Sequence, residues 1–372
     1  MYQPKLLSFV ITPIFIKTLL ATVIILTSIH TIFLYYEVSI TTALDHAAAV
    51  SPLRPPKEAN CLPQLSPDLS ETLQLLQSSC RSSLRDSKSH IRITTVTAQF
   101  GNIREHYQNA LQSHVLHTTL HDNGLEVMCT PVVDDLWNKP AYILSLLLDE
   151  MLKPPEERTE WLFWVDRDTI ILDQCRPISS FLPPRILNRV AASTKARGAA
   201  PKDEDVHLVA ADDWNGLNNG VFLLRVGQWA IELFSAIMAF RHFRPGTELR
   251  FTEQSAMEIL IKEKRFKKGV RMVPQTWFNS YPGSLKATTY LEGNDEKGLS
   301  DWQARRGDFL IHFAGFGEDD RARSMNSWLD MLGKTHFTLE AVRVQRNATP
   351  DIEAYWQDLE PIEIQQALVW DY

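Results

Sequence analysis

The chain has 372 residues, of which 44% are hydrophobic, so it is long enough to form one large domain or two ordinary ones. Its formal net charge is -7, whereas general binding to nucleic acid requires a basic surface. We therefore expect no nucleic-acid partner.

An uncharged apolar stretch at residues 18–36 is the first strong pattern in the chain. A helix of this length, at about 1.5 Å per residue, can cross a hydrocarbon core of roughly 30 Å. Lysines precede the stretch and acidic residues follow it, which predicts a cytosolic tail at residues 1–17 and a luminal remainder. A cleaved signal peptide is the alternative interpretation. Both interpretations send the chain into the secretory pathway.

Residues 37–90 are rich in Pro and Ser and show no sustained hydrophobic period, which is typical of a stem. Within this stem, the segment ETLQLLQSS (71–79) is expected to form a short helix. The folded domain is expected at residues 91–345, and a C-terminal extension at residues 346–372.

The four cysteines fit an oxidising compartment, where disulfides persist. Four cysteines permit three pairings, and the sequence leaves the choice open. They are Cys61, Cys80, Cys129 and Cys175. Asn347 opens an Asn-Ala-Thr sequon, which predicts an N-linked glycan, although Pro350 follows the sequon directly.

Strand and helix patterns alternate along the expected folded domain. Strands are predicted within residues 91–101, 125–129, 160–165, 206–211, 220–225 and 308–316. Helices are predicted within residues 104–124, 140–153, 226–243 and 252–266. Such alternation predicts an α/β fold with a mainly parallel sheet. In sheets of this kind, ligands bind at the carboxyl ends of the strands.

The segment WLFWVDRD (161–168) contains the clearest candidate for chemistry. Its continuous apolar run suits a strand buried on both faces, which places Asp166 and Asp168 at the carboxyl end of that strand. In an extended chain the two carboxylates point to the same side, and Arg167 points away. Two like charges so close need a cation between them, or one of them must stay protonated. A hard divalent ion with oxygen ligands is the natural occupant. A solvated surface turn is the alternative, but the position after a buried strand favours the metal.

Three further segments offer polar groups. Asn218 and Gly220 lie in a predicted polar loop before an apolar strand, where amides and close backbone approach suit a sugar ligand or an ordinary turn equally well. Glu253 and Gln254 follow Thr252, a candidate helix cap, so they face either the helix dipole or a reacting sugar.

His312 lies in a late apolar strand, where a histidine is more often a satisfied core residue than a ligand. A neutral imidazole is nevertheless a suitable ligand for a transition metal such as Mn²⁺. Together with Asp166 and Asp168, it would leave coordination positions open for diphosphate oxygens.

Taken in order, six short segments resemble glycosyltransferase family 34, the fungal Golgi galactosyl- and mannosyltransferases related to plant xyloglucan xylosyltransferases. These segments cover most of residues 92–320. They are LWNKP (136–140), EWLFWVDRD (160–168), GLNNGVFLLR (216–225), TEQSA (252–256), NSYPG (279–283) and GDFLIHFAG (307–315).

The resemblance implies a GT-A fold, which is a Rossmann-like mixed, mainly parallel sheet flanked by helices, behind an N-terminal transmembrane helix. It implies a retaining hexosyltransferase that uses UDP-galactose or GDP-mannose, a glycan acceptor, and Mn²⁺ or another divalent cation. The expected location is the Golgi membrane, with a single type II span and a luminal catalytic domain. Membership of a Golgi glycosyltransferase complex is a further expectation.

The resemblance also assigns roles to residues. Asp166, Asp168 and His312 match the metal ligands, and Glu253 and Gln254 match catalytic residues beside the donor sugar.

The donor-binding residues implied by the resemblance lie in two segments. Lys139 matches a lysine near the donor diphosphate, whereas Asn218 and Gly220 belong to the loop that shapes the donor and acceptor pocket.

The chain departs from the family pattern at three places. Phe316 stands where many relatives have a cysteine, and Gly317 stands where some have a basic residue near the diphosphate. Arg321 and Arg323 follow a little later. The sequence alone does not decide whether either arginine replaces this basic contact, on which the choice of donor and the strength of its binding depend. Arg167 replaces a small residue, and we expect this to be tolerated because its side chain is predicted to point away.

Two other functions are compatible with parts of this sequence. A phosphatase of the haloacid dehalogenase type also carries two aspartates after an apolar strand. However, Ile170 replaces its usual Thr or Val, the motif comes roughly 75 residues into the domain, and a luminal anchor fits it poorly. A non-catalytic subunit of a mannan-type glycosyltransferase complex is the second alternative. The presence of Asp166, Asp168 and His312 argues against it.

Overall fold

The structure is a computed structural model that describes residues 20–34, 61, 69–80, 91–99, 104–184, 206–283, 287, 299–334 and 344–358. The chain divides into two compact units, Met1–Arg54 and Pro55–Tyr372.

In the smaller unit, residues 20–34 are helical. The ends of the expected anchor at residues 18–36, and the expected tail at residues 1–17, lie outside the described residues. Within the described part of the chain, no helix combines the length and the apolar character needed to cross a membrane.

A six-stranded sheet forms the centre of the larger unit, with the strand order β2-β1-β3-β6-β5-β7 in the described part of the chain. All of these strands run in one direction except β6, which is antiparallel to both of its neighbours. The expected mixed, mainly parallel α/β sheet is therefore confirmed. The strands are β1 (Ile93–Ala98), β2 (Gly124–Met128), β3 (Trp161–Val165), β5 (Leu208–Asp213), β6 (Gly216–Arg225) and β7 (Val270–Met272).

Strand β3 lies in the middle of the sheet and is buried along its whole length. Because side chains alternate along a strand, Phe163 and Val165 enter the hydrophobic cluster on one face of the sheet. Leu162 and Trp164 enter the cluster on the other face. This two-sided burial explains why the sequence of β3 is a continuous apolar run.

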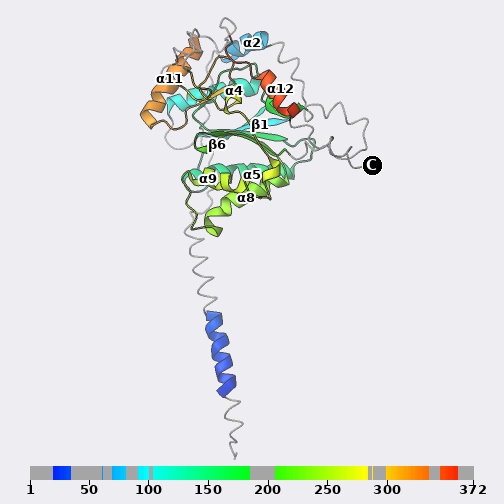
Figure 1. Cartoon of the computed structure of the whole chain (residues 1–372), viewed down its shortest axis with the longest axis vertical. Helices are drawn as coiled ribbons and strands as arrows, with labels where there is room; N and C mark the ends of the chain where they lie inside the picture. The colour runs from blue at the N-terminus through cyan, green and yellow to red at the C-terminus, as the bar shows by residue number, and fades with distance from the viewer. Residues whose placement is uncertain are drawn as a thin grey trace, which may run out of the picture. The chain divides into compact units, whose positions relative to one another are not determined.

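Helices cover the sheet on both sides and give three layers (Figure 1). One side carries α5 (Asn138–Leu152), α8 (Gln228–Phe243) and α9 (Thr252–Ile261). The other side carries α2 (Leu69–Ser79), α4 (Glu105–Leu120), α11 (Glu318–Lys334) and α12 (Thr349–Asp358). The helices expected from periodicity are thus present, and their ends differ from expectation by a few residues.

A second, two-stranded sheet brings the late histidine to the end of β3. Strand β4 (Thr169–Ile171) follows β3 after a short turn and pairs antiparallel with β8 (Leu310–His312), so that Thr169 lies opposite His312. The expected late strand is therefore short and pairs outside the main sheet. This pairing places His312 beside Asp168, although more than 140 residues separate them in the sequence.

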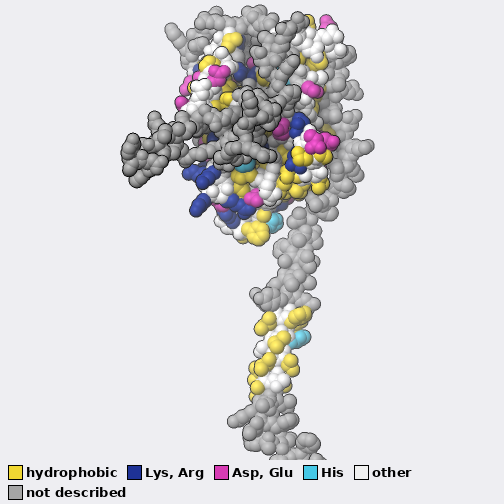
Figure 2. Space-filling view, turned by 90° about the vertical axis from the view of Figure 1, so that its right-hand side faces the viewer, with side chains coloured by type: hydrophobic (Ala, Val, Ile, Leu, Met, Phe, Trp, Pro, Cys, Tyr) yellow, Lys and Arg dark blue, Asp and Glu magenta, His cyan; other side chains and the backbone are white. Residues whose placement is uncertain are grey.

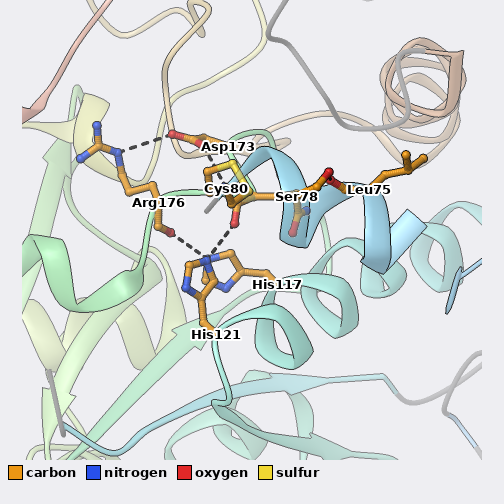
Figure 3. Close-up of a disulfide and its surroundings, with 9 residues drawn as sticks. Leu75, Ser78, Cys80, His117, His121, Asp173 and Arg176 are labelled. Carbon is orange, nitrogen blue, oxygen red and sulfur yellow. Dashed lines mark hydrogen bonds and ion pairs between the residues drawn. A yellow bond between two sulfur atoms is a disulfide. The ribbon is translucent and has the colours of Figure 1, made fainter. Parts of the chain in front are cut away.

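Two disulfides join early segments of the larger unit to its core. Cys61 pairs with Cys129, and Cys80 pairs with Cys175. Figure 3 shows Cys80 at the end of α2, close to His117 and His121 of α4. Helix α2 lies in the segment expected to be a stem, yet it packs through Leu76 on α4. This part of the segment therefore belongs to the folded unit.

Helix α12 lies in the segment expected to extend beyond the folded domain. Its Ile352 and Trp356 are buried in the same cluster as Phe163 and Trp277. The described part of the C-terminal segment consequently contributes to the core.

Basic side chains gather on the lower part of the larger unit in Figure 2, the region where α8 and α9 lie in Figure 1. Arg244 pairs with Glu263 at 2.7 Å, and Arg265 pairs with Glu232 at 2.8 Å. These exposed pairs show a solvated helix surface in which cations are matched by acids, and each pair contributes little to stability alone.

Candidate active site

Asp166, Asp168 and His312 meet at the carboxyl end of β3. The two aspartates follow β3 in a turn, and His312 is the last residue of β8. One ligand atom from each lies within 4.8 Å of the others, and Nε2 of His312 is 3.4 Å from Oδ1 of Asp168. Two ligands of one six-coordinate cation lie roughly 3 Å apart. The spacing therefore suits ligands that share one cation.

Asn279 orients the His312 ring from behind. Nδ1 of His312 lies 2.8 Å from Oδ1 of Asn279, and both side chains are buried. When Nδ1–H donates to this oxygen, the lone pair on Nε2 points toward the aspartates. This is the usual arrangement for a metal-binding histidine, because a hydrogen-bonded partner sets both its tautomer and its orientation.

Asp168 is an ionised carboxylate in this cluster. Burial alone would raise its pKa, but His312, when protonated, and Arg321 favour the charged form and bring the pKa of Asp168 to about 2. The Arg321 guanidinium contributes through a 3.1 Å contact between its Nε and Oδ2 of Asp168. Asp168 is thus available as an anionic ligand at any physiological pH.

Gly220 makes the close packing of the cluster possible. Its carbonyl oxygen accepts a hydrogen bond from the backbone N–H of Asp166 at 2.8 Å. A Cβ at this position would lie 2.3 Å from Cε1 of His312 and 3.0 Å from Oδ2 of Asp166. Gly220 therefore lies directly behind the candidate ligands, where it has a steric role.

The predicted polar loop at residues 216–220 is part of strand β6, so the expectation of a loop was wrong. The pairing of β6 with β5 is irregular, because Ala210 pairs with Phe222 while the next residue, Ala211, pairs with Asn218. Such an irregularity re-aims side chains and is common beside active sites. Here it lets the intervening Asn219 bond to Lys139 and Gln254.

Asn218 and Asn219 have different surroundings in this irregular segment. The buried Nδ2 of Asn218 donates to the Tyr281 hydroxyl at 2.5 Å and to Asp213 at 3.0 Å. Asn219 lines the cleft, whereas Asn218 and Gly220 are not among the cleft-lining residues. The sequence pattern predicted that this segment belongs to the site. It did not predict which of the two asparagine side chains lines the cleft.

Lys139 lies next to the carboxylates. Its Nζ is 3.1 Å from Oδ1 of Asp166 and 3.5 Å from Oε1 of Glu253, and it donates to Oδ1 of Asn219 at 3.0 Å. Burial lowers its pKa, but the two carboxylates outweigh this effect and the net pKa of Lys139 is raised. Lys139 is therefore a fixed positive charge beside Asp166, as expected for a diphosphate-binding lysine.

Glu253 and Gln254 lie at the start of α9. Glu253 is buried and is bonded to the Thr252 hydroxyl at 3.0 Å as well as paired with Lys139. Gln254 lines the cleft, and its Oε1 accepts the backbone N–H of Asn219 at 3.2 Å. The structure thus brings both residues to the site, with Gln254 the more accessible of the two.

Thr252 does not cap α9, contrary to expectation. The helix starts at Thr252 itself, without a side-chain cap at the preceding Phe251, and Thr252 has a φ of 44°. The Phe251 N–H donates instead to the Ser255 hydroxyl at 3.0 Å. A non-glycine residue with positive φ stores strain, which is frequent at functional sites. Asp135, with a φ of 47°, lines the same cleft.

Arg167 and Arg321 add positive charge to the wall of the cleft. Residues 166–168 form a turn, so strand alternation ends at Val165 and the expectation that Arg167 points away from the site was wrong. Its guanidinium lies 4.2 Å from the ring centroid of Tyr107, and the side chain lines the cleft. Arg321 of α11 also lines the cleft. Arg321 supplies a basic group near Asp168, whereas Gly317, which stands where some relatives have a basic residue, has no side chain to do so.

A cleft of about 550 Å³ joins these groups. Ala98 and Met128, the last residues of β1 and β2, form part of its apolar wall, together with Trp164 of β3. The cleft therefore lies at the carboxyl ends of parallel strands, where α/β sheets bind their ligands. Its volume is in the range of pockets that hold cofactor-sized molecules.

The donor set fits a hard divalent cation. Two carboxylates and one imidazole belong to different segments, and the imidazole is oriented by Asn279. Such oxygen and nitrogen donors suit Mn²⁺ or Mg²⁺ better than a soft metal. Asp166 and Asp168 also line the open cleft, so a cation here would contact a ligand inside it.

Asn347 lies on the surface, outside this site. It is exposed, and its Oδ1 accepts the backbone N–H of Thr349 at 3.1 Å. Its glycosylation stays a prediction.

Comparison with known proteins places these features in context. A family model described as the galactosyl transferase GMA12/MNN10 family matches residues 102–322, more than half of the chain. An uncharacterized alpha-1,2-galactosyltransferase of Schizosaccharomyces pombe is 26% identical over 231 residues, which are 58% of this chain and 63% of the relative. An alpha-1,2-galactosyltransferase of the same yeast is 27% identical over 193 residues, 47% of this chain and 46% of the relative.

The chain spans less than two thirds of the length of either yeast relative. Among solved structures, a glycosyltransferase involved in the glycosylation of the major capsid of PBCV-1 is 13% identical with a TM-score of 0.43, and the match covers 63% of this chain and 98% of that chain.

Proposed function

The chain belongs to the galactosyl transferase GMA12/MNN10 family, and on this premise we propose that it is a retaining hexosyltransferase. It moves galactose or mannose from a nucleotide sugar to a glycan acceptor. The names of the two yeast relatives favour galactose, and therefore UDP-galactose, over GDP-mannose.

One observation carries the proposal. The cluster of Asp166, Asp168 and His312 opens into a cleft that also receives Gln254 from α9. A nucleotide sugar presents a diphosphate and an adjoining sugar, and the cleft offers a cation site for the first and an amide for the second. A cleft with only one of these groups would suit many small ligands equally well.

We assign Mn²⁺, or another divalent cation, to Asp166, Asp168 and His312. When bound, such a cation supplies Lewis-acid neutralisation of the charge on the departing diphosphate. Lys139 and Arg321 contribute further positive charge from the protein itself, because both contact the aspartates and line the cleft. Preorganised charges of this kind act without reorganising during the reaction.

Gln254 and Glu253 act at the sugar end of the donor. Retention of configuration is explained by attack of an acceptor hydroxyl on the face that the leaving diphosphate vacates. The bond to the diphosphate breaks, the sugar acquires oxocarbenium character, and the hydroxyl proton passes to the leaving diphosphate. The cleft-lining Gln254 presents its amide dipole to this cation-like ring. Glu253 is buried and paired with Lys139, so it holds the lysine in position. Its carboxylate also contributes negative electrostatic potential at the cation-like sugar ring.

The cellular setting is part of the proposal. Two disulfides support an oxidising compartment, and the apolar stretch at residues 18–36 supports a membrane anchor. We therefore propose a type II protein of the Golgi membrane with a luminal catalytic unit, acting alone or within a glycosyltransferase complex.

Donor turnover by the purified full-length protein tests the proposal. With Mn²⁺ present, we expect release of nucleoside diphosphate from UDP-galactose or GDP-mannose, and faster release when a glycan acceptor is added. In Gln254→Ala, transfer should be lost while Mn²⁺ and donor still bind. Full transfer activity in Gln254→Ala would contradict the role of this residue.

The same assay separates the other two functions. Cleavage of p-nitrophenyl phosphate without nucleotide-sugar turnover would indicate a phosphatase. Absence of both activities, with the protein correctly folded, would indicate a non-catalytic subunit.

A further inference from the structure

An exposed aromatic group lies at the tip of the β5–β6 hairpin, next to the site. Trp214 occupies the turn between the two strands and is 66% exposed. Among the large hydrophobic side chains that the described residues expose, it is the only tryptophan. An indole left in water offers a large apolar face that a ligand can cover.

Two other rings hold Trp214 in place. Tyr281 packs edge-to-face against it with ring centroids 5.2 Å apart, and Trp302 does so at 5.5 Å. The Tyr281 hydroxyl donates to Oδ2 of Asp213 at 2.6 Å. Oδ1 of Asp213 accepts the backbone N–H of Asn215 at 2.6 Å and so closes the turn. The indole is therefore presented by a preorganised support, which reduces the entropy lost when a ligand binds.

This platform is continuous with the candidate ligands. Tyr281 also packs edge-to-face against His312, with ring centroids 5.8 Å apart. Trp214 is thus connected to His312 by two ring-to-ring contacts, through the buried Tyr281 ring. Trp214, Tyr281 and Trp302 are not part of the lining of the donor cleft. The platform therefore approaches the reacting centre from outside the space assigned to the donor.

The charges around the turn indicate the chemistry of the ligand. Asp212 and Asp213 flank Trp214 on one side, and Asp301 precedes Trp302. The Asp213 carboxylate beside the indole repels phosphate at this point of the surface, while Lys262 lies near Asp212, and Arg305 and Arg346 contact Asp301. A neutral pyranose ring has an apolar C–H face that stacks on an indole and hydroxyls that reach nearby amides and carboxylates.

We propose that Trp214 is a stacking subsite for the acceptor glycan, and that it binds a sugar one or two units away from the sugar that receives the transferred hexose. This inference rests on the proposed transferase function, and it adds the recognition of an acceptor longer than one sugar. Tyr281 and Trp302 are positioning residues that support the indole.

Binding of acceptor sugars of increasing length tests the subsite. Mono-, di- and trisaccharides of mannose, galactose and glucose are titrated by calorimetry into the full-length protein without donor. We expect the wild type to bind a trisaccharide of at least one series more tightly than the monosaccharide. In Trp214→Ala the ratio of trisaccharide affinity to monosaccharide affinity should fall by about tenfold. In Trp214→Tyr part of this ratio should remain.

A matched surface variant controls for loss of an exposed ring. Phe243 at the end of α8 is 84% exposed, so Phe243→Ala removes an aromatic side chain that has no part in the site. In Phe243→Ala, the affinity should increase with the number of sugars as it does in the wild type. In transfer assays, Trp214→Ala should raise KM for the trisaccharide acceptor more than it lowers kcat.

Failure of the inference and failure of the proposed function give different results. If the wild type transfers hexose but Trp214→Ala shows the same acceptor KM and the same length dependence, the subsite is refuted and the transferase stands. If no oligosaccharide series binds the wild type more tightly than its monosaccharide, the subsite is likewise refuted. If length-dependent binding requires Trp214 but no donor turns over, Trp214 is a glycan-binding residue, and both the transferase and the acceptor role of the subsite are refuted.

Discussion

Gly220 is the residue on which the spacing of the candidate ligands most depends. A Cβ there would lie 2.3 Å from His312, and overpacking of this kind costs roughly 1–3 kcal/mol, or about 5- to 150-fold in an equilibrium constant. We expect Gly220→Ala to lower Mn²⁺ affinity within that range, measured by paramagnetic resonance titration. Gly227→Ala is the matched control, because a Cβ at Gly227 meets nothing within 4 Å. Equal Mn²⁺ affinity in the two variants would contradict this role.

Asn279 acts on the same cluster through a hydrogen bond. Removal of a partner that orients a metal-binding histidine typically costs 10- to 100-fold in metal affinity. We expect this loss in Asn279→Ala, since the His312 ring would no longer be held by a contact of 2.8 Å. Asn279→Asp keeps an acceptor oxygen and should recover much of the affinity. If Asn279→Ala bound Mn²⁺ as tightly as the wild type, the proposed tautomer of His312 would be wrong.

At the scale of elements, the strongest patterns were predictable. Strand β3 was identified by its continuous apolar run, because burial on both faces leaves no room for polar positions. Asp166 and Asp168 were then placed at its carboxyl end by sheet geometry alone. The role of His312 needed the family resemblance, because nothing within its own segment distinguishes a ligand from a core histidine.

The features that could not be predicted from the sequence depend on contacts between distant segments. The irregular register of β6 arises from its pairing with β5, so the sequence could not show that Asn219 lines the cleft while Asn218 does not. Asn279 begins the NSYPG segment and Arg321 follows Gly317, but the contact of Asn279 with His312 and that of Arg321 with Asp168 arise only in the folded chain. The Cys80–Cys175 pairing has the same origin, since it follows from how α2 packs on α4.

Helix α4 carries buried histidines that should make stability depend on pH. Burial lowers the pKa of His114 from 6.5 to about 4 and also lowers that of His117. Below pH 6.5 the unfolded chain therefore takes up protons that the folded chain excludes, so stability falls as the pH drops from 6.5 toward 4. Each such histidine contributes up to about 1.4 kcal/mol per pH unit.

We expect the free energy of unfolding of His114→Gln to change less steeply with pH than that of the wild type, by up to about 1.4 kcal/mol per pH unit. Urea unfolding at pH 7, 6 and 5 measures it, and comparison with the wild type cancels the contributions of other groups. His242→Gln, at an exposed position of α8, controls for loss of a histidine. An identical slope in His114→Gln and the wild type would show that His114 titrates normally in the folded state.

At the scale of the whole molecule, the disulfides link stability to compartment. The Cys80–Cys175 bond joins residues 95 positions apart and ties α2 to the segment after β4. Removal of a native disulfide that closes a loop of this size typically costs 2–5 kcal/mol. The protein is therefore expected to be substantially less stable in a reducing environment, which agrees with its proposed location.

The double variant Cys80→Ser with Cys175→Ser should consequently unfold at a temperature several degrees lower than the wild type. A reductant should lower the unfolding temperature of the wild type further than that of the double variant, because one of the two bonds is already missing there. The pair Cys61→Ser with Cys129→Ser is the matched control, with its own bond across 68 positions. Peptide mapping without reduction identifies the linked cysteines directly. Alkylation of all four thiols in the unreduced, unfolded wild type would show that neither bond forms, and the argument for an oxidising compartment would then lose its structural support.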